Sequence, residues 1–425
     1  MICEPLTDIF RSSISSRTFP VLWKNAFIQP IPKKTNCRSI DDYRQISLLP
    51  IIAKVLEKLI LLSMRDTLVK LFGKSQHAFR PGGSTTSALI DIHDCVTSFM
   101  EEKDTICVRL TCLDFSKAFD KVHHHRLINI LHQTRLNKGF LKWLHSFLSN
   151  RFQRISFEGH IGQLMEVPSG VPQGSVLAPY LFALFIGNLY VEAPNAHLVK
   201  FADDLTLIEL CSKNDPNPNN LLAVEEWIEE NKMYLNLRKC RQMIFRRTRS
   251  MSSSPYPNIE LCPDVNILGV TFSDSLSWDN HFDAVILKAS RRLHTLRALK
   301  PYVSKKQLIE VHNGFIMSVL TYASPVFCKL SAATVMKLSR LRRRAHRIIC
   351  DPLCNCSAVP DPICVHRQLL RKFLVKCNSP AHVLHHLVPP KLNSGRYCVQ
   401  FCSTSRRQNS FFPYACFLSN IEMRR

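Results

Sequence analysis

The stretch HLVKFADDLTLIEL, residues 197–210, limits most strongly what this chain can fold into, because it places an acidic pair inside apolar sequence. The apolar residues on either side of Asp203 and Asp204 predict two short strands joined by a tight turn at the pair. Aspartate is common in turns, so an ordinary solvated turn is the alternative interpretation. A second carboxylate at the end of another strand would favour a functional site.

Such a carboxylate lies upstream, in the segment CVRLTCLD at residues 107–114. This run is rich in β-forming residues and ends at Asp114. Carboxylates from this strand end and from the hairpin turn could hold a pair of divalent ions, which suits phosphoryl transfer to a 3′-hydroxyl. Asp114, Asp203 and Asp204 are therefore the candidate catalytic and metal-ligating residues.

Seven blocks of the sequence, these two acidic segments among them, resemble the reverse transcriptases of non-LTR, LINE-type retrotransposons of the Jockey-like group. Three blocks resemble that family's catalytic motifs, namely LDFSKAFD at residues 113–120, SGVPQGSVLAPYLF at 169–182 and FADD at 201–204. The other four are DDYRQISLLPIIAKVLEKLI from residue 41, QHAFRPGGSTTSAL from 76, LNLRKCRQMIF from 235 and VNILGVTFSDSLSW from 265. A single FADD is a weak signal, whereas seven blocks in one order are highly specific.

The resemblance implies an α+β fold of the right-hand polymerase type, with fingers, an antiparallel-sheet palm and a helical C-terminal thumb. We expect the N-terminal segment and fingers at residues 1–100, the palm with the first catalytic motif at 101–122, and a fingers insertion at 123–167. The palm with the other two motifs and the primer grip would follow at 168–278, a basic helical thumb at 279–350, and a tail containing Cys and His at 351–425.

The resemblance also implies two residues near the sugar of an incoming nucleotide. Phe119 stands five residues after Asp114, where the family places an aromatic side chain that blocks a ribose 2′-hydroxyl. An ordinary core aromatic is the alternative. Gln173 lies in the loop SGVPQG, whose glycines let the backbone approach a nucleotide closely, and a plain turn residue is the alternative there.

Three cations complete the nucleotide site that the resemblance implies. Arg44 would reach the triphosphate, although the family usually has proline where Gln45 follows it. Arg80 would contact the template or nucleotide, or else pair with a carboxylate. Lys239 would position a phosphate or protonate the leaving pyrophosphate, and the acid role would require burial to tune its pKa.

The formal net charge of +23 and the pI near 9.5 point to a polyanionic partner, RNA or DNA, with acidic membrane surfaces as the alternative. Two helical segments of the expected thumb, KASRRLHTLRALK and VMKLSRLRRRAHRII, carry arginines opposite apolar residues. These arginines could bind duplex phosphates, or form a solvated face. The most apolar stretch, residues 176–191, is broken by Pro179, Gly187 and Asn188, so we expect a buried helix and no membrane span.

The seventeen cysteines are scattered, many of them in apolar runs, and no signal peptide precedes them, so we expect free thiols in a reducing, intracellular setting. One cluster lacks the paired CxxC of common zinc sites, so scattered free thiols and a metal knuckle both stay open. Its members are Cys350, Cys354, Cys356, Cys364 and His366. The run of His123, His124 and His125 is interpreted as solvated residues at a helix start.

The function that the resemblance implies is RNA-templated DNA synthesis from a primer 3′-hydroxyl with two Mg²⁺ ions, Mn²⁺ being an alternative. The partners would be an RNA template, a DNA primer or target and dNTPs, while the oligomeric state is not indicated. Synthesis on chromosomal DNA implies the nucleus, and the RNA would be met in the cytoplasm. The family's endonuclease domain is not seen upstream, so we expect a fragment, a truncated copy or a protein relying on an enzyme in trans.

Two other functions stay open. A viral-type RNA polymerase would share the carboxylates, but would be expected to have a polar residue in place of Phe119 and a glycine in place of Ala202. A catalytically inactive retrotransposon remnant that only binds nucleic acid would keep the fold and the charge.

Overall fold

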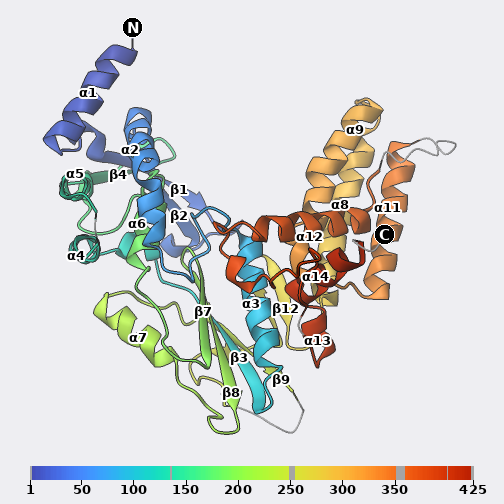
Figure 1. Ribbon diagram of the computed structural model, residues 1–425. Coiled ribbons are helices and arrows are strands. Elements are labelled where there is room, and N and C mark those ends of the chain that lie inside the picture. Colours follow the sequence, from blue (N-terminus) through green and yellow to red (C-terminus); the bar gives the residue numbers. More distant parts are fainter. Residues whose placement is uncertain (1, 135, 248–253, 351–358, 400, 423–425) are drawn as a thin grey trace. The chain divides into compact units, whose positions relative to one another are not determined.

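The computed structural model describes the whole chain except residues 1, 135, 248–253, 351–358, 400 and 423–425. Two compact units make up the protein (Figure 1). The first unit comprises Met1–Phe79, Asp114–Val191 and Leu221–Asn236, and the second comprises Arg80–Leu113, Glu192–Asn220 and Leu237–Arg425. The domain boundaries expected from the sequence stay predictions.

The first unit contains the sheet expected for the fingers. Its strands run in the order β2-β1-β4-β5, with β6 also paired to β4. Their bounds are β1 Asn25–Pro32, β2 Tyr43–Leu48, β4 Phe152–Phe157, β5 His160–Ile161 and β6 Met165–Glu166.

The sequence suggests an edge strand at β1 because of its prolines, and this prediction is wrong. β1 lies between β2, with which it pairs antiparallel, and β4, with which it pairs in parallel. The pairing with β4 ends at Ile28, so Pro30 and Pro32 lie beyond the residues that β4 contacts. A proline has no backbone N–H to donate to a neighbouring strand. Pro30 and Pro32 therefore lie in the part of β1 that has β2 as its one paired neighbour.

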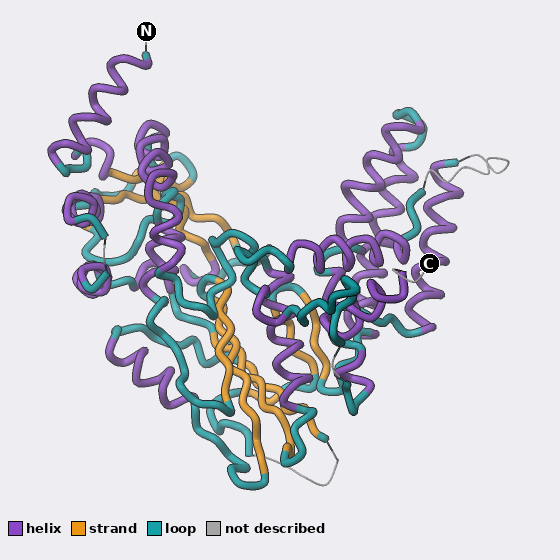
Figure 2. The backbone as a smooth tube through the Cα atoms, viewed as in Figure 1, coloured by secondary structure: helices purple, strands orange, loops and turns teal. Residues whose placement is uncertain are grey.

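Helices make up much of the rest of the first unit (Figure 2). They are α1 Cys3–Ser16, α2 Ile51–Lys70, α4 His124–His132, α5 Lys138–Leu148, α6 Ala178–Phe185 and α7 Leu221–Glu230, with short 3₁₀ helices at Val21–Lys24, Ile40–Asp42 and Ala118–Lys121. Most of α6 is buried, as its apolar sequence predicts. The buried face of α2 holds Leu56 and Ile60, whereas the neighbouring apolar residues Val55 and Leu59 are 45% and 48% exposed.

The second unit contains the sheet expected for the palm, in the order β10-β9-β3-β8-β7. Its strands are β3 Thr105–Leu113, β7 Ala196–Phe201, β8 Asp204–Ser212, β9 Arg241–Arg246 and β10 Glu260–Leu261. β3 pairs antiparallel with both β8 and β9, and β7 pairs antiparallel with β8, so the core of the sheet is antiparallel as expected. Helix α3, Thr85–Phe99, packs against β3, β7 and β8, and its N-cap is Ser84, as the sequence predicts.

A buried ion pair crosses this sheet. Arg109 of β3 and Glu209 of β8 are opposite each other in the register, and Arg109 Nε lies 2.9 Å from Glu209 Oε2. Both side chains are at most 2% exposed. The Tyr256 hydroxyl and the backbone N–H of Asn220 also donate to Glu209, which satisfies the buried carboxylate. The Glu209 carboxylate thereby attaches the polar loop NDPNPNN, which ends at Asn220, to the sheet.

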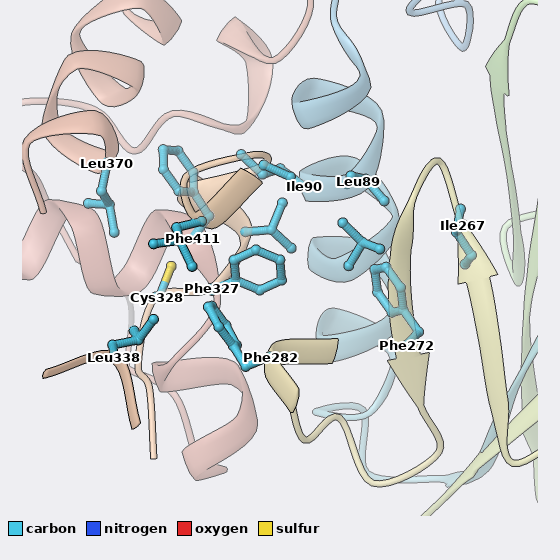
Figure 3. Packing of buried hydrophobic residues seen from close by; sticks show 14 of the residues in the cluster. Leu89, Ile90, Ile267, Phe272, Phe282, Phe327, Cys328, Leu338, Leu370 and Phe411 are labelled. Carbon is cyan, nitrogen blue, oxygen red and sulfur yellow. The ribbon is translucent and has the colours of Figure 1, made fainter. Parts of the chain in front are cut away.

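The remainder of the second unit is a hairpin followed by helices. Its elements are β11 Asp264–Ile267, β12 Val270–Ser273, α8 Asp279–Leu299, α9 Lys305–Val311, the π-helix His312–Met317, α10 Ser318–Leu320, α11 Ala332–Ile349, α12 Pro362–Cys377, α13 Ser405–Gln408, α14 Phe411–Glu422, and the 3₁₀ helices Ser324–Val326 and His385–Leu387. They share one apolar core with α3, and its members include Phe272, Phe282, Phe327, Leu338, Leu370 and Phe411 (Figure 3).

The C-terminal segment, whose role the sequence does not reveal, belongs to this core. Phe411 and Phe412 are 1% and 2% exposed. Ahead of them, Glu101 after α3 accepts hydrogen bonds from the backbone N–H groups of Ser403 and Thr404. Arg407 Nη1 lies 2.6 Å from Asp94 of α3. The segment is thus a structural part of the second unit.

The proposed cysteine and histidine cluster lies partly outside the described residues, because Cys354 and Cys356 fall there. Of the others, Cys350 is buried and Cys364 is exposed. His366 is buried, with Nδ1 2.7 Å from the Ser324 hydroxyl. Within the described part of the chain, no group of three or more His, Cys, Asp or Glu side chains is arranged to hold a metal ion. Over the same residues, no helix is long and apolar enough to cross a membrane.

Candidate catalytic and nucleotide site

The acidic pair lies at the tip of the β7–β8 hairpin, as the sequence predicts. Phe201 pairs with Asp204, so the turn consists of Ala202 and Asp203 alone. Ala202 has φ 54°, in the left-handed region that costs a non-glycine residue roughly 1–2 kcal/mol. Asp203 is partly exposed and Asp204 is exposed, so both carboxylates are accessible at the tip.

Asp114 comes directly after the strand that pairs with β8, and the register places the end of β3 opposite the start of β8. Leu113, the last residue of β3, pairs with Leu205 of β8. Asp114 directly follows Leu113, and Asp204 directly precedes Leu205. All the candidate donors are carboxylate oxygens, the ligand type that Mg²⁺ prefers. The donor set therefore fits the divalent ions that the sequence implies, and the residues that hold them stay a prediction.

Lys200 is a feature of the hairpin that the sequence analysis missed. It is fully buried in β7, opposite Leu205 in the register. Burial lowers the pKa of Lys200 to about 7. The signal in the sequence is a lysine inside an otherwise apolar strand.

In the first unit, the loop SGVPQG is attached along the turn that contains Phe119. Val171 N–H donates to the Phe119 carbonyl and Gly170 N–H to the Val122 carbonyl, both at 2.8 Å. The Ser169 hydroxyl donates to the Asp120 carbonyl at 3.1 Å. Gly170 has φ 92°, and a Cβ there would lie 2.8 Å from the same carbonyl oxygen. Only glycine allows this approach.

The other end of the loop is held by β2 and α2. The Ser47 N–H donates to the Gln173 carbonyl at 2.7 Å, and a Cβ on Gly174 would collide with the Ser47 carbonyl. Glu57 of α2 is fully buried and accepts the N–H groups of Val176 and Leu177 just before α6. A carboxylate at a helix N-terminus satisfies its unpaired donors and complements the helix dipole. Glu57 is a second residue that the sequence analysis missed.

Phe119 is partly exposed, and its ring stacks on the fully buried ring of Phe182 in α6. The centroids are 4.6 Å apart and the planes are inclined by 19°. The packing fixes one face of the Phe119 ring, as a steric gate requires. Its partial exposure distinguishes Phe119 from a fully buried core aromatic such as Phe182, and its role as a gate stays a prediction.

The carboxamide of Gln173 is also held. Its Nε2 donates to Oδ1 of Asp120 at 2.9 Å. Both side chains line a pocket of about 190 Å³ that Gln45 and Ser47 of β2 and the buried Arg151 also line. Burial raises the pKa of Asp120. Gln173 is therefore more than a turn residue, because its side chain is oriented by a specific partner.

A histidine side chain also binds the backbone of the SGVPQG loop. His124 Nε2 donates to the Gly170 carbonyl at 2.6 Å. Burial lowers the pKa of His124. The interpretation of all three consecutive histidines as solvated is thus wrong for His124, although His125 is exposed.

The three cations implied for the nucleotide site lie on different segments. Arg44 is exposed on β2, three residues before the Ser47 that binds the Gln173 carbonyl. Arg80 is half-buried at the start of the second unit, and burial lowers its pKa. Lys239 is exposed in the second unit, so the burial that an acid role would require is not present. Their roles stay predictions.

The antiparallel palm sheet with an acidic hairpin, together with the loop bound to the turn after Asp114, defines a polymerase of the right-hand class. Residues 31–272, more than half of the chain, match the family described as "Reverse transcriptase (RNA-dependent DNA polymerase)". The chain belongs to this family.

Two curated relatives from Drosophila melanogaster support the resemblance to non-LTR elements. The "RNA-directed DNA polymerase from mobile element jockey" is 26% identical over 377 residues, covering 81% of this chain and 39% of that protein. The "Probable RNA-directed DNA polymerase from transposon X-element" is 29% identical over 361 residues, with the same coverage. The chain spans only about 39% of the length of these relatives.

Among solved structures, telomerase from Candida tropicalis in complex with a TWJ fragment of telomeric RNA matches with a TM-score of 0.45. The sequence identity is 12%, and the match covers 91% of this chain and 67% of the telomerase chain.

Proposed function

We propose that this chain is the polymerase part of a non-LTR retrotransposon protein and extends a DNA primer with dNTPs on an RNA template. The observation that carries the proposal is the binding of the Gln173 loop to the turn just after Asp114. That turn contains the partly exposed Phe119, whose ring stacks on Phe182. Family membership supplies the reaction class, and the local geometry supplies residues suited to it.

In this proposal Asp114, Asp203 and Asp204 hold two Mg²⁺ ions. The ions would activate the primer 3′-hydroxyl and neutralise charge on the leaving pyrophosphate. The chain's own contribution is positioning, because the hairpin turn at Ala202 fixes the direction of the acidic pair and the register of β3 fixes Asp114. Positioning is the main catalytic device that phosphoryl transfer leaves to a protein.

The nucleotide is selected by Phe119 and Gln173. The packed ring of Phe119 cannot retreat from a ribose 2′-hydroxyl without losing its stacking on Phe182. Arg44, on the strand beside the loop, is exposed and suited to the triphosphate. A viral-type RNA polymerase, which must admit the 2′-hydroxyl, is disfavoured by this packing.

The template and primer are held by phosphate contacts from the thumb. Helix α11 has no acidic residue, and its buried face contains Leu338, Leu341 and Ala345. Its exposed face carries Arg340, Arg343, Arg344 and Arg347. Like charges three and four residues apart destabilise a helix slightly, so an arginine face of this kind favours a polyanionic partner.

We propose that DNA synthesis takes place in the nucleus.

Primer extension by the purified chain tests the proposal. With Mg²⁺, dNTPs and an RNA template, the wild type should extend the primer and Asp114→Asn should lower the rate by at least about 10³-fold, since a lost metal ligand removes several kcal/mol of transition-state stabilisation. Asp66→Asn, an exposed position on α2, is the matched control and should leave the rate unchanged. Equal rates for Asp114→Asn and the wild type would refute the assignment.

A further inference from the structure

The hydrogen bond between Asp120 and Gln173 joins two segments that are 53 residues apart in sequence. Asp120 directly follows Phe119, and Gln173 occupies the loop that binds the same turn. We propose that Asp120 is a positioning residue that orients the Gln173 carboxamide and so sets the affinity for the incoming nucleotide. This inference rests on the proposed function and adds a residue to its nucleotide site.

The chemistry of a carboxylate decides how the Gln173 amide is turned. A carboxamide can present either its oxygen or its NH₂ group, and the two orientations are similar in shape. An ionised carboxylate only accepts, so Asp120 binds the Nε2 end. The Oε1 atom has no hydrogen-bond partner among the residues that the structure describes, and it is left to accept from a ligand in the pocket.

A sugar hydroxyl is a donor that such an oxygen can accept. The carboxylate thereby converts an amide that could either donate or accept into a defined acceptor in the pocket that both side chains line. If the amide were turned round, its NH₂ group would face the hydroxyl, which could then only serve as an acceptor. Orientation by Asp120 therefore affects nucleotide affinity more than the rate of the chemical step.

The loop does not depend on the Asp120 carboxylate for its attachment. The backbone bonds from Val171 to Phe119 and from Gly170 to Val122 persist without it, as does the Ser47 bond to the Gln173 carbonyl. Removing the carboxylate should leave the loop in place and free only the amide. This separates an orienting role from a structural one.

The hydrogen bond and the positive charges around Asp120 only partly offset the effect of burial on the pKa of its carboxyl group. Burial raises the pKa of Asp120, whereas the hydrogen bond from Gln173 and the charges of Lys117, Lys33 and Lys121 act in the opposite direction. Lys117 also pairs with the exposed Asp41, 3.1 Å away. The lysines surround the turn without replacing the Gln173 bond.

A double-mutant cycle tests the proposal, with KM for dATP, kcat and the thermal unfolding midpoint as readouts. Asp120→Ala should raise KM by about 10-fold or more, as expected for a lost hydrogen bond to a charged group, with kcat within about 3-fold. Gln173→Ala should raise KM comparably, and Asp120→Ala should add less than about 2-fold in that background. Asp66→Ala on α2 is the matched control and should change neither quantity.

The conservative variant Asp120→Asn should give a KM between those of the wild type and Asp120→Ala, because its oxygen can still accept while its NH₂ group allows the amide to turn. The unfolding midpoint should stay within a few degrees for all variants. Multiplicative effects in the cycle would overturn the proposal. A lower midpoint with unchanged KM would also overturn it, since that is the result of a purely structural contact.

Binding of dATP to the primer-template complex with Ca²⁺ in place of Mg²⁺ keeps the inference separate from the proposed function. A wild type that binds dATP without extending the primer refutes the activity. In that case weaker dATP binding by Asp120→Ala still supports the orienting role, and equal binding overturns it. A wild type that neither extends nor binds dATP overturns both.

Discussion

The ring of Phe119 stacks on the ring of Phe182, with centroids 4.6 Å apart and planes inclined by 19°. Phe182 is fully buried in α6, and α6 begins at a helix end bound by the buried carboxylate of Glu57. The position of the proposed gate is therefore determined by α2 and α6, which lie outside its own motif. This dependence leads to predictions about the gate, the loop and the helix end.

Replacing the gate with a smaller side chain should relax sugar selection. In Phe119→Val the clash with a 2′-hydroxyl is removed, so we expect the ratio of kcat/KM for dATP over ATP to fall by about 10²-fold, equivalent to about 2.7 kcal/mol. Single-nucleotide incorporation measures this ratio. An unchanged ratio would show that Phe119 is only a core aromatic.

A side chain at Gly170 should be destabilising for two reasons, namely its positive φ and its close approach to the Asp120 backbone. Gly170→Ala should lower the free energy of unfolding by about 3 kcal/mol or more, since φ is 92° and the new Cβ meets the Asp120 backbone. Gly159→Ala is the matched control, with φ 82° and no atom within 4 Å, and should cost only about 1–2 kcal/mol. Equal losses in urea unfolding would contradict the close approach of loop and turn.

The buried Glu57 should stabilise the start of α6. Glu57→Gln removes a charge that accepts two backbone N–H groups, so we expect a loss of about 1.5–3 kcal/mol. The rate of primer extension should fall as well, because Gln173 lies in the preceding loop. Glu229→Gln, at an exposed site on α7, is the control and should have little effect. The proposed role fails if both variants unfold at the same urea concentration.

Three buried histidines should make the second unit sensitive to acid. Burial is the largest cause that lowers the pKa of His93, His281 and His366 to about 4, from 6.5. The unfolded chain takes up protons near pH 6.5 while the folded chain does not, so their stability contribution is fully present above pH 6.5 and is lost as the pH falls towards about 4. The limit is about 3 kcal/mol per histidine.

Urea unfolding at pH 7.5 and pH 4.5 measures this loss. His281→Gln cannot titrate, and should reduce the difference in unfolding free energy between the two pH values. His125→Gln replaces an exposed histidine and is the control. A difference as large in His281→Gln as in the wild type would contradict the account of acid sensitivity.

The arginine face of α11 should contribute to binding of a primer-template duplex through phosphates. Changing its four arginines to glutamine should reduce the slope of log K against log salt by about 3–4, from roughly 0.9 per phosphate contact. The residues are Arg340, Arg343, Arg344 and Arg347. Fluorescence anisotropy over a salt series measures the slope.

A matched change elsewhere controls for net charge. The control replaces four exposed cations of the first unit with glutamine, namely Arg11, Arg17, Lys138 and Lys142. This variant has the same net charge as the α11 variant and should keep most of the wild-type slope. If the two variants give equal slopes, the effect comes from overall charge and α11 is not a contact surface.

The sequence predicts what depends on local pattern. The hairpin at Asp203, the strand ending at Leu113 and the N-cap at Ser84 each follow from residues next to one another along the chain. The family resemblance adds the roles of Phe119 and Gln173, which no local pattern contains.

The sequence does not reveal contacts between distant segments. The parallel pairing of β1 with β4 places β1 inside the sheet, and it joins residues such as Asn25 and Phe152 that are far apart in the chain. The bond between Asp120 and Gln173, and the burial of Phe411 against α12, depend on the same kind of packing. A residue's own neighbours in sequence do not determine such contacts.

The product of a primer-extension reaction tests most directly whether the chain copies RNA into DNA. An RNA template of known sequence, a DNA primer, Mg²⁺ and the four dNTPs should give DNA complementary to the template. The same reaction with Asp203→Ala and Asp204→Ala together should give none. Wild-type protein that binds the primer-template tightly and in a salt-sensitive manner, yet yields no complementary DNA, would contradict the claim and identify a nucleic-acid-binding remnant.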